Sequence, residues 1–316
     1  MISLPGTGGV RLTYVIMCAT ASRELAEPLA ATAATARTWL LLEQTGPWGA
    51  NALLDSHLDP ELGRALEAAA EGTGVRLALI RRPGRHADCH QPASRRFFVA
   101  HTAPGNAWVR HGTTADPREL LGLDFAALGA GTEPPGTAPY DGDTLAFVCT
   151  NGKRDRCCAL LGRPLAAALR AAGGTDTWEI THLGGHRFAP TLLLLPHGYA
   201  YGRVSAHAVK EIAEAVHEGR VVLEGCRGRS TWDRPGQCAE LAVRSHAGVA
   251  GADDLTVVRT EGANPAWTVL VRHRDGRSWS VDVTATAGPE PSPASCGAPA
   301  LPQLRLTAGE PRSLPR

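Results

Sequence analysis

The sequence predicts an α/β protein with two similar halves and a small β appendage after them. Three observations predict this fold class. Apolar, strand-like runs alternate with helical patterns in both halves, a Gly- and Pro-rich stretch at residues 129–139 separates them, and alternating strands follow residue 226. The length of 316 residues also suits about two domains of roughly 150 residues each.

The first half is expected to contain one helix among several strands. Asp59 is a good helix cap and Pro60 suits the first helical position, so a helix is predicted from there to Glu71. Apolar runs and a hairpin pattern give the strands. The predicted strands lie at residues 38–43, 75–80, 96–100 and 107–110.

A similar order returns after the stretch at 129–139, whose Gly and Pro content cannot sustain a helix or an interior strand. A helix passes through residues 165–172, and Ser205 caps a final helix that ends near Gly219. This β-α-β-β-α order suits a thioredoxin-like layer of helices on a mixed sheet. We therefore predict two thioredoxin-like domains related by a degenerate duplication. The strands of the second half are expected at residues 144–148, 177–181, 191–195 and 199–204.

The region from residue 226 onward has a different character. Asp275-Gly276 between alternating strands is a strong hairpin signal. From Gly288 the chain is Pro-rich and lacks periodicity, so it is expected to form an extended or loosely ordered tail. The strands expected here lie at residues 255–259, 266–274 and 277–283. The predicted domains are 17–128, 140–225 and 226–316.

Composition narrows the function classes. Lys and Arg total 32 against 31 Asp and Glu, which argues against nucleic acid as the main partner. No stretch approaches the roughly 18 uncharged apolar residues that span a bilayer, so membrane insertion is not expected. The eight cysteines are too sparse for a secreted disulfide framework, and residues 12–18 lack a signal-peptide cleavage site. A reducing, cytoplasmic location is therefore expected.

Soft metal-ligand residues gather in the second half. Cys149 stands where the strand at 144–148 ends, and Cys157 and Cys158 open the following helix. Successive residues of a helix point about 100° apart, so these two neighbours are not expected to bind the same metal. One of them is predicted to be a ligand and the other a packed thiol.

Two histidines complete the set. His182 and His186 flank Gly184-Gly185, which breaks a helix and lets both histidines converge from a loop. A zinc protease is excluded because Leu183 stands where that motif needs Glu. A structural Cys2His2 zinc site stays open, although the gap from Cys149 to Cys158 exceeds the two to four intervening residues of usual zinc knuckles.

The segments 149–158 and 181–189 resemble the signatures of the sucrase/ferredoxin-like family, whose members include thioredoxin-like ferredoxins. The resemblance also takes in the region around Cys18 and residues 295–297. It implies a [2Fe-2S] cluster, with Cys158 as a ligand because it comes three residues after Asp155, and with Cys157 as an extra thiol. No carboxylate pair suits glycoside hydrolysis, so the sucrase part of the name has no support. The implied cluster ligands are Cys149, Cys158, His182 and His186.

The function predicted from these motifs is one-electron transfer rather than catalysis of bond chemistry, with a redox protein as partner. Neutral imidazoles make the cluster less negative than four thiolates would, so its potential should exceed that of an all-cysteine ferredoxin. The alternative is an interaction module in which zinc only supports folding. A disulfide reductase is disfavoured because neither half has Cys-x-x-Cys where its first strand ends.

The other candidate residues are expected to have structural roles. The loop at 83–86 should bind no metal, because its half lacks cysteines at the matching strand end. The basic residues of the loop at 150–156 are either solvated or a guide for an acidic redox partner. Residues assigned structural roles are His197, His207, His217, Cys226, Cys238 and Cys296.

Overall fold

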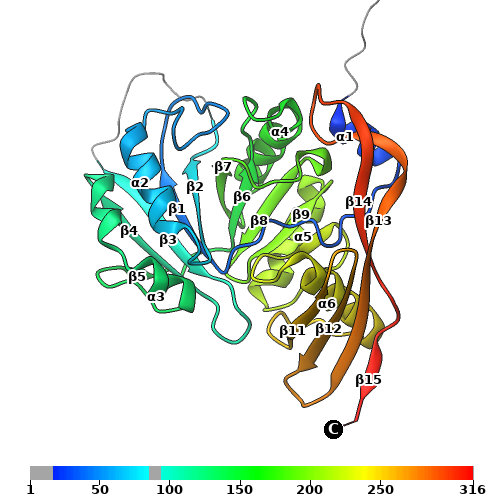
Figure 1. Ribbon diagram of the computed structural model, residues 1–316. Coiled ribbons are helices and arrows are strands. Elements are labelled where there is room, and N and C mark those ends of the chain that lie inside the picture. Colours follow the sequence, from blue (N-terminus) through cyan, green and yellow to red (C-terminus); the bar gives the residue numbers. More distant parts are fainter. Residues whose placement is uncertain (1–16, 85–93, 316) are drawn as a thin grey trace, which may run out of the picture.

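The computed structural model describes residues 17–84 and 94–315. Within these residues the chain forms a ten-stranded sheet and a separate five-stranded sheet, both flanked by helices (Figure 1). The α/β class predicted from the sequence is thus confirmed. None of the described helices has both the length and the apolar character needed to cross a membrane.

The first half of the large sheet follows the predicted elements closely. β1 runs parallel to β2 and antiparallel to β3, which in turn pairs antiparallel with β4. Helix α2 begins as predicted, because the Asp59 side chain accepts a hydrogen bond from the Glu61 backbone N–H at 2.9 Å. The elements are β1 (Thr38–Glu43), α2 (Pro60–Ala70), β2 (Val75–Arg81), β3 (Arg95–His101) and β4 (Trp108–Thr114).

The stretch at 129–139 is only partly irregular, which corrects the sequence expectation. Its first two residues complete helix α3 (Phe125–Ala130), and Gly131, at φ 96°, ends that helix in a left-handed conformation. Near its end, β5 (Ala138–Pro139) pairs with β4. Proline is tolerated there because β5 is the outermost strand of the sheet. A 3-10 helix, η1 (Pro117–Gly122), precedes this stretch.

The second half repeats the strand order of the first. β6 runs parallel to β7 and antiparallel to β8, which pairs antiparallel with β9. Helix α4 starts at Arg156, nine residues before the predicted range of 165–172. Ser205 caps α5 as predicted, because its side chain accepts a hydrogen bond from the Ala208 N–H at 3.2 Å. The elements are β6 (Leu145–Cys149), α4 (Arg156–Ala172), β7 (Asp176–Ile180), β8 (Thr191–Leu195), β9 (Tyr199–Gly202) and α5 (Ala206–His217).

The two halves join where β2 and β7 pair antiparallel at their carboxyl ends. The paired residues Arg81 and Glu179 form a buried ion pair, with 2.8 Å between Nε and Oε2. Beside them Phe98 of the first half stacks edge-on against Phe147 and Trp178 of the second, with ring centroids 6.0 and 5.5 Å apart. One apolar core therefore extends through both halves.

The chain after α5 adds both a strand to the large sheet and the second sheet. β10 (Cys226–Arg229) pairs with β9, so residues 226–229 belong to the large sheet rather than to the appendage. Helix α6 (Arg234–Ala247), which the sequence analysis did not anticipate, packs on the five-stranded sheet. That sheet contains β11 (Leu255–Ala263), β12 (Ala266–His273), β13 (Ser278–Pro293), β14 (Ala300–Ala308) and β15 (Arg312–Leu314).

The expectation of a loosely ordered tail from Gly288 was wrong. The chain continues as β13 to Pro293 and returns as β14, with Pro291 opposite Pro302. These prolines are tolerated because the pairing is irregular just before them and β14 is an edge strand. Leu306, on β14, is only 7% exposed, so the strand contributes to the core of the small sheet.

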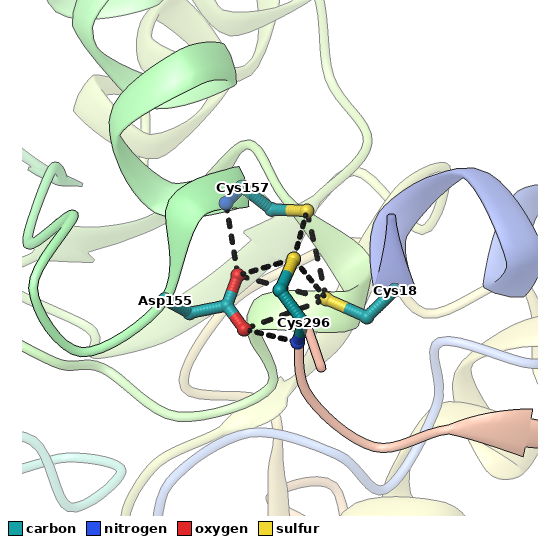
Figure 2. Close-up of side chains that lie close together, drawn as sticks. All are labelled: Cys18, Asp155, Cys157 and Cys296. Carbon is teal, nitrogen blue, oxygen red and sulfur yellow. Dashed lines mark hydrogen bonds between the residues drawn. The ribbon is translucent and has the colours of Figure 1, made fainter. Parts of the chain in front are cut away.

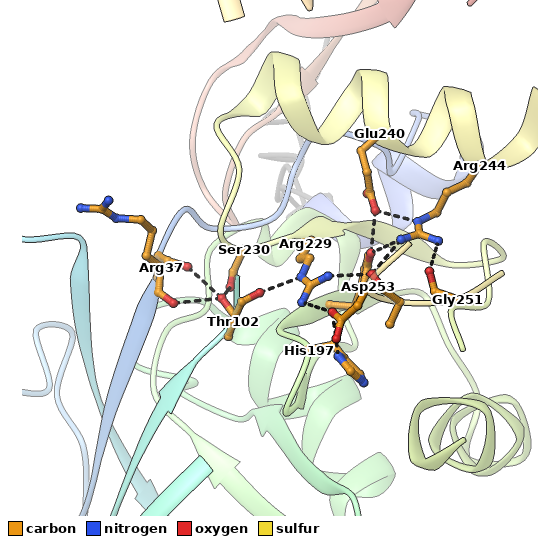
Figure 3. Close-up of polar contacts among 12 residues, drawn as sticks. Arg37, Thr102, His197, Arg229, Ser230, Glu240, Arg244, Gly251 and Asp253 are labelled. Carbon is orange, nitrogen blue, oxygen red and sulfur yellow. Dashed lines mark hydrogen bonds and ion pairs between the residues drawn. The ribbon is translucent and has the colours of Figure 1, made fainter. Parts of the chain in front are cut away.

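Buried arginines fasten α6 and the second sheet to the large sheet (Figure 3). Arg244 and Glu240 of α6 form a fully buried ion pair, with 2.6 Å between Nε and Oε1, and Tyr199 of β9 donates to the same carboxylate. Arg229 of β10 donates to the Thr102 carbonyl at 2.7 Å and to Asp253 at 2.9 Å. The Arg244–Glu240 pair lies wholly in the interior, so removing one of these two partners leaves the other without compensation.

We predict that Arg244→Met lowers the free energy of unfolding by about 3–5 kcal/mol, because Glu240 would stay buried without its cation. Arg220→Ala is the control, since it breaks an exposed pair with Glu218 and should cost less than about 1 kcal/mol. Denaturant unfolding of both variants measures the difference. Equal losses of unfolding free energy in the two variants would contradict the prediction.

Candidate metal centre

The two cysteines predicted as ligands are brought together by the close packing of α4 against the end of β6. Cys149 is the last residue of β6, Cys158 lies in the first turn of α4, and both are 1% exposed. A Cβ on Gly162 of α4 would lie 2.1 Å from the Cys149 carbonyl oxygen. Only glycine therefore allows the helix to approach this closely.

The loop between the cysteines is fixed at several points. Thr150 donates to Glu179 at 2.9 Å, and the Asn151 side chain donates to the Gly49 carbonyl of the other half at 3.1 Å. Asp155 caps α4 by accepting from the Cys157 N–H at 2.8 Å. The cap sets the direction of the helix and hence of both cysteine side chains.

The two histidines stand on the loop that follows β7, as predicted. Gly184 and Gly185 have φ of 81° and 68°, and the 3-10 helix η2 (His186–Phe188) follows directly. The rings of His182 and His186 have centroids 5.3 Å apart and planes inclined by 36°. The Nδ1 atom of each ring is buried without a hydrogen-bond partner. Buried polar atoms are nearly always satisfied, so these nitrogens have the character of ligand atoms.

Three of the four predicted ligands form a compact group. The sulfurs of Cys149 and Cys158 and a ring nitrogen of His182 all lie within 4.8 Å of one another. His186 neighbours His182 but does not belong to that group. Its Nε2 atom instead lies 3.7 Å from Oδ2 of Asp155. All four predicted ligands therefore lie in the same region. His186 contacts His182 but is not part of the compact group that contains the two thiols.

The electrostatic surroundings favour thiolate at this site. The Cys158 thiol, together with His182 and the Leu183 N–H, holds the pKa of Cys149 well below its usual value, although burial acts to raise it. Hydrogen bonding to Cys149 and burial raise the pKa of Cys158. A single thiolate is thus stabilised between the two sulfurs before any cation binds.

A buried arginine that the sequence analysis did not single out lies behind the histidine loop. Arg227 of β10 is fully buried, and its Nε donates to Thr32 at 3.0 Å. Burial lowers its pKa to about 10, while the sulfurs of Cys149 and Cys158 act in the opposite direction. A Cβ on Gly185 would lie 2.1 Å from Nη2 of this arginine. Both glycines therefore allow the turn, and Gly185 also allows the Arg227 guanidinium to come close to the histidine loop.

A second group of ligand-type side chains was missed by sequence reasoning. Cys18, Asp155, Cys157 and Cys296 lie together (Figure 2). Asp155 also links this group to the first site, because its Oδ2 atom lies 3.7 Å from Nε2 of His186. Cys157 and Cys158 thus belong to different groups, as their helical spacing predicts. The one available signal was that the sequence resemblance takes in the segments around Cys18 and Cys296.

Of the cysteines assigned structural roles, Cys296 lies in the second group, whereas Cys226 and Cys238 lie apart from both groups. Cys226 and Cys238 are buried in apolar clusters, and the described cysteines form no disulfide. The basic side chains Lys153, Arg154 and Arg156 are exposed at the start of α4. His86 and Cys89, together with most of the segment 12–18, lie outside the described residues.

Comparison with known proteins agrees with the motifs. The family model described as sucrase/ferredoxin-like matches residues 29–228, which include both cysteines and both histidines of the first site. This chain belongs to the sucrase/ferredoxin-like family. The match covers nearly the whole large sheet and ends at β10, so the five-stranded sheet lies outside the family region. Cys18 and Cys296 of the second group also lie outside the family match at residues 29–228.

A curated relative is altered inheritance of mitochondria protein 32 of Candida glabrata. It is 29% identical over 101 residues, which are 27% of this chain and 32% of the relative. The chain thus matches about a third of the length of that protein. No solved structure gives a significant match.

We predict that Gly185→Ala destabilises this sucrase/ferredoxin-like protein more than Gly184→Ala does. Both glycines have positive φ, which costs an alanine about 1–2 kcal/mol. Only Gly185 would also drive a Cβ into Arg227, because nothing lies within 4 Å of a Cβ at Gly184. The clash should add about 1–3 kcal/mol to the loss of unfolding free energy measured in denaturant. Equal losses would contradict the tight contact.

Proposed function

We propose that this protein is a one-electron carrier with a [2Fe-2S] cluster, and not an enzyme of bond chemistry. Cys149 and Cys158 would hold one iron, and His182 and His186 the other. The observation that carries the proposal is the pair of buried, unpartnered Nδ1 atoms of His182 and His186, with His182 in turn next to two buried cysteine sulfurs. Thiolate and imidazole are the donors that such clusters use when two histidines replace two cysteines.

The position of His186 supports a two-iron cluster over a single ion. Ligands of one tetrahedral zinc lie about 3.3–3.8 Å apart, given metal–ligand bonds of about 2.0–2.3 Å. His186 stands outside the compact group of the other three donors. The ligands of a centre with two metal atoms are farther apart than those of a single ion. Such a centre can therefore include His186 as well as the three compact donors.

The charges around the site also suit such a cluster. Two thiolates, two sulfides and two ferric ions with neutral imidazoles carry no net charge, and reduction adds one negative charge. The buried guanidinium of Arg227 and the amino end of α4 would both stabilise that charge.

The roles of the side chains follow from this assignment. When bound, the cluster would accept and release a single electron. His186 would bind through Nδ1 and direct Nε2 towards Asp155, which lies 3.7 Å away. A carboxylate in that position orients a ligating imidazole and fixes its tautomer. Burial lowers the pKa of His186, which favours the neutral ring that a ligand requires.

The surroundings of the site suggest where a redox partner would bind. Lys153, Arg154 and Arg156 are exposed, and Arg156 lines one pocket together with Leu160, which is 58% exposed. Exposed basic side chains near an exposed apolar side chain fit a partner protein with an acidic rim. We infer a reducing, cytoplasmic location, because eight cysteines in 316 residues are too sparse for a secreted disulfide framework.

We also infer that the halves of the large sheet are two thioredoxin-like units from a degenerate duplication. The order β2-β1-β3-β4 of the first half has the same relative strand directions as β7-β6-β8-β9 of the second. A helix follows the first strand of each unit, α2 in one and α4 in the other. Only the second unit has cysteines at the exit of that strand.

The second candidate function is an interaction module whose zinc ion supports folding. The compact group of Cys149, Cys158 and His182 favours it, since three donors within 4.8 Å could serve one ion. Colour and composition separate the two functions. A carrier would be red-brown and contain iron and acid-labile sulfide, whereas the zinc module would be colourless.

We predict that anaerobically purified protein contains about two irons and two sulfides per chain. Cys158→Ser should abolish the visible absorption, because it removes one of two thiolates on the same iron. Cys157→Ser should leave that absorption largely intact, as its sulfur belongs to the other group. Cys238→Ser, in a buried cluster away from both sites, is the control. A colourless wild-type protein with zinc alone would overturn the carrier.

A further prediction concerns the reduction potential. His186→Cys, if it keeps the cluster, should lower the potential by about 100 mV or more, because an anionic sulfur replaces a neutral nitrogen on the same iron. Protein-film voltammetry of the wild type and the variant measures the shift. The same potential in both proteins would mean that His186 is not a ligand.

A further inference from the structure

Three cysteines and an aspartate converge from distant parts of the chain (Figure 2). Cys18 is the first residue of α1 (Cys18–Glu24), Asp155 and Cys157 stand at the start of α4, and Cys296 lies between β13 and β14. The sulfur of Cys157 is 3.5 Å from that of Cys18 and 3.3 Å from that of Cys296. The third sulfur–sulfur distance, between Cys18 and Cys296, is 3.7 Å.

The carboxylate of Asp155 completes a four-donor set. Its Oδ1 atom lies 3.6 Å from the Cys18 sulfur and 3.3 Å from the Cys296 sulfur. A tetrahedral zinc ion with bonds of about 2.3 Å to sulfur and 2.0 Å to oxygen sets its ligands about 3.8 Å apart for two sulfurs and about 3.5 Å for sulfur and oxygen. The donors already stand near these spacings.

Hydrogen bonds from the backbone hold the carboxylate in place. It accepts from the Cys157 N–H and from the Cys296 N–H, each at 2.8 Å. Cys18 and Cys157 are fully buried, and Cys296 is partly exposed at the rim. A carboxylate among three sulfurs needs a cation before those sulfurs can ionise together, and a divalent metal supplies it.

Two other arrangements fit less well. A disulfide needs sulfurs about 2.05 Å apart, and it would leave the third cysteine and the aspartate unused. An iron–sulfur cluster spreads its ligands over two or more irons, whereas these four donors all lie within 4.8 Å of one another. Thiolate-rich tetrahedral sites of this size suit zinc.

We propose that this group binds a single zinc ion. The proposal does not depend on the function of the first site. Its ligands are Cys18, Asp155, Cys157 and Cys296.

The ion would fasten two outlying segments to the amino end of α4. Helix α1 lies against η2 and β13, so these segments cover the histidine loop. A polar network already links them, since Glu27 accepts from Ser22 and from Arg187 at 2.9 Å each, and from Ser292. Zinc would add a far stronger link between these segments at Cys18 and Cys296. Asp155 would then lie between the zinc ion and His186.

Metal analysis of the full chain tests the site. Protein purified from zinc-supplemented medium should contain about one zinc per chain beside its iron. Cys296→Ser is the preferred variant, because its side chain is the most exposed of the four and its loss disturbs packing least. Zinc should fall at least tenfold in this variant, on the order expected when a ligand is removed. Cys238→Ser should keep the full amount, and zinc retained in Cys296→Ser overturns the proposal.

A measurement on the wild-type protein covers the case in which a variant fails to fold. Cys18, Cys157 and Cys296 should resist alkylation in the zinc-loaded protein and react once a chelator has removed the ion, as peptide mass spectrometry would show. A disulfide between any two of them, or equal reactivity before and after chelation, overturns the site.

The two metal centres are distinguished by which metal each cysteine variant loses. Cys158→Ser should lose iron and keep zinc, whereas Cys296→Ser should lose zinc and keep iron. Zinc that leaves with Cys158→Ser and stays with Cys296→Ser would place the ion at the histidines, which overturns both assignments. Iron lost in Cys296→Ser without any zinc in the wild type overturns the zinc site alone.

Discussion

The carboxylate of Asp155 is the constraint on which the rest of the site depends. It caps α4, accepts the backbone N–H of Cys296, and faces the ring of His186. Burial acts to raise the pKa of Asp155, yet the N–H groups of Cys296 and Cys157 hold it below the usual value. The group therefore remains a charged acceptor. The Asp155 carboxylate thus holds the start of α4, the β13–β14 connection at Cys296 and the ring of His186 close to one another.

Most of the large sheet could be predicted from local sequence signals. The Asp59-Pro60 and Ser205 caps and the apolar runs of β1 and β6 are consistent with their surroundings, so propensity and tertiary packing agree. The thiol and histidine motifs could be found because each is contiguous in sequence and stands where a strand ends. The ligand roles of those residues stay predictions.

What escaped prediction depends on contacts between distant residues. The Pro-rich segment after Gly288 has no periodicity of its own, and it becomes β structure only because β13 offers β14 a partner. Helix α6 has little apolar character overall, and its Arg244 and Glu240 form a fully buried ion pair. Cys18 and Cys296 are 278 positions apart, and no local pattern can reveal that they meet.

The seam between β2 and β7 makes the loop after Cys149 depend on the first half of the large sheet. Asn151 binds Gly49 across it, and Arg81 reaches both Glu179 and the Gly46 carbonyl. The half without cysteines at its strand exit thus supplies a wall for the loop that follows Cys149. A fragment containing only the second half would lose that wall, so the loop after Cys149 depends on a half that has no cysteine at its own strand exit.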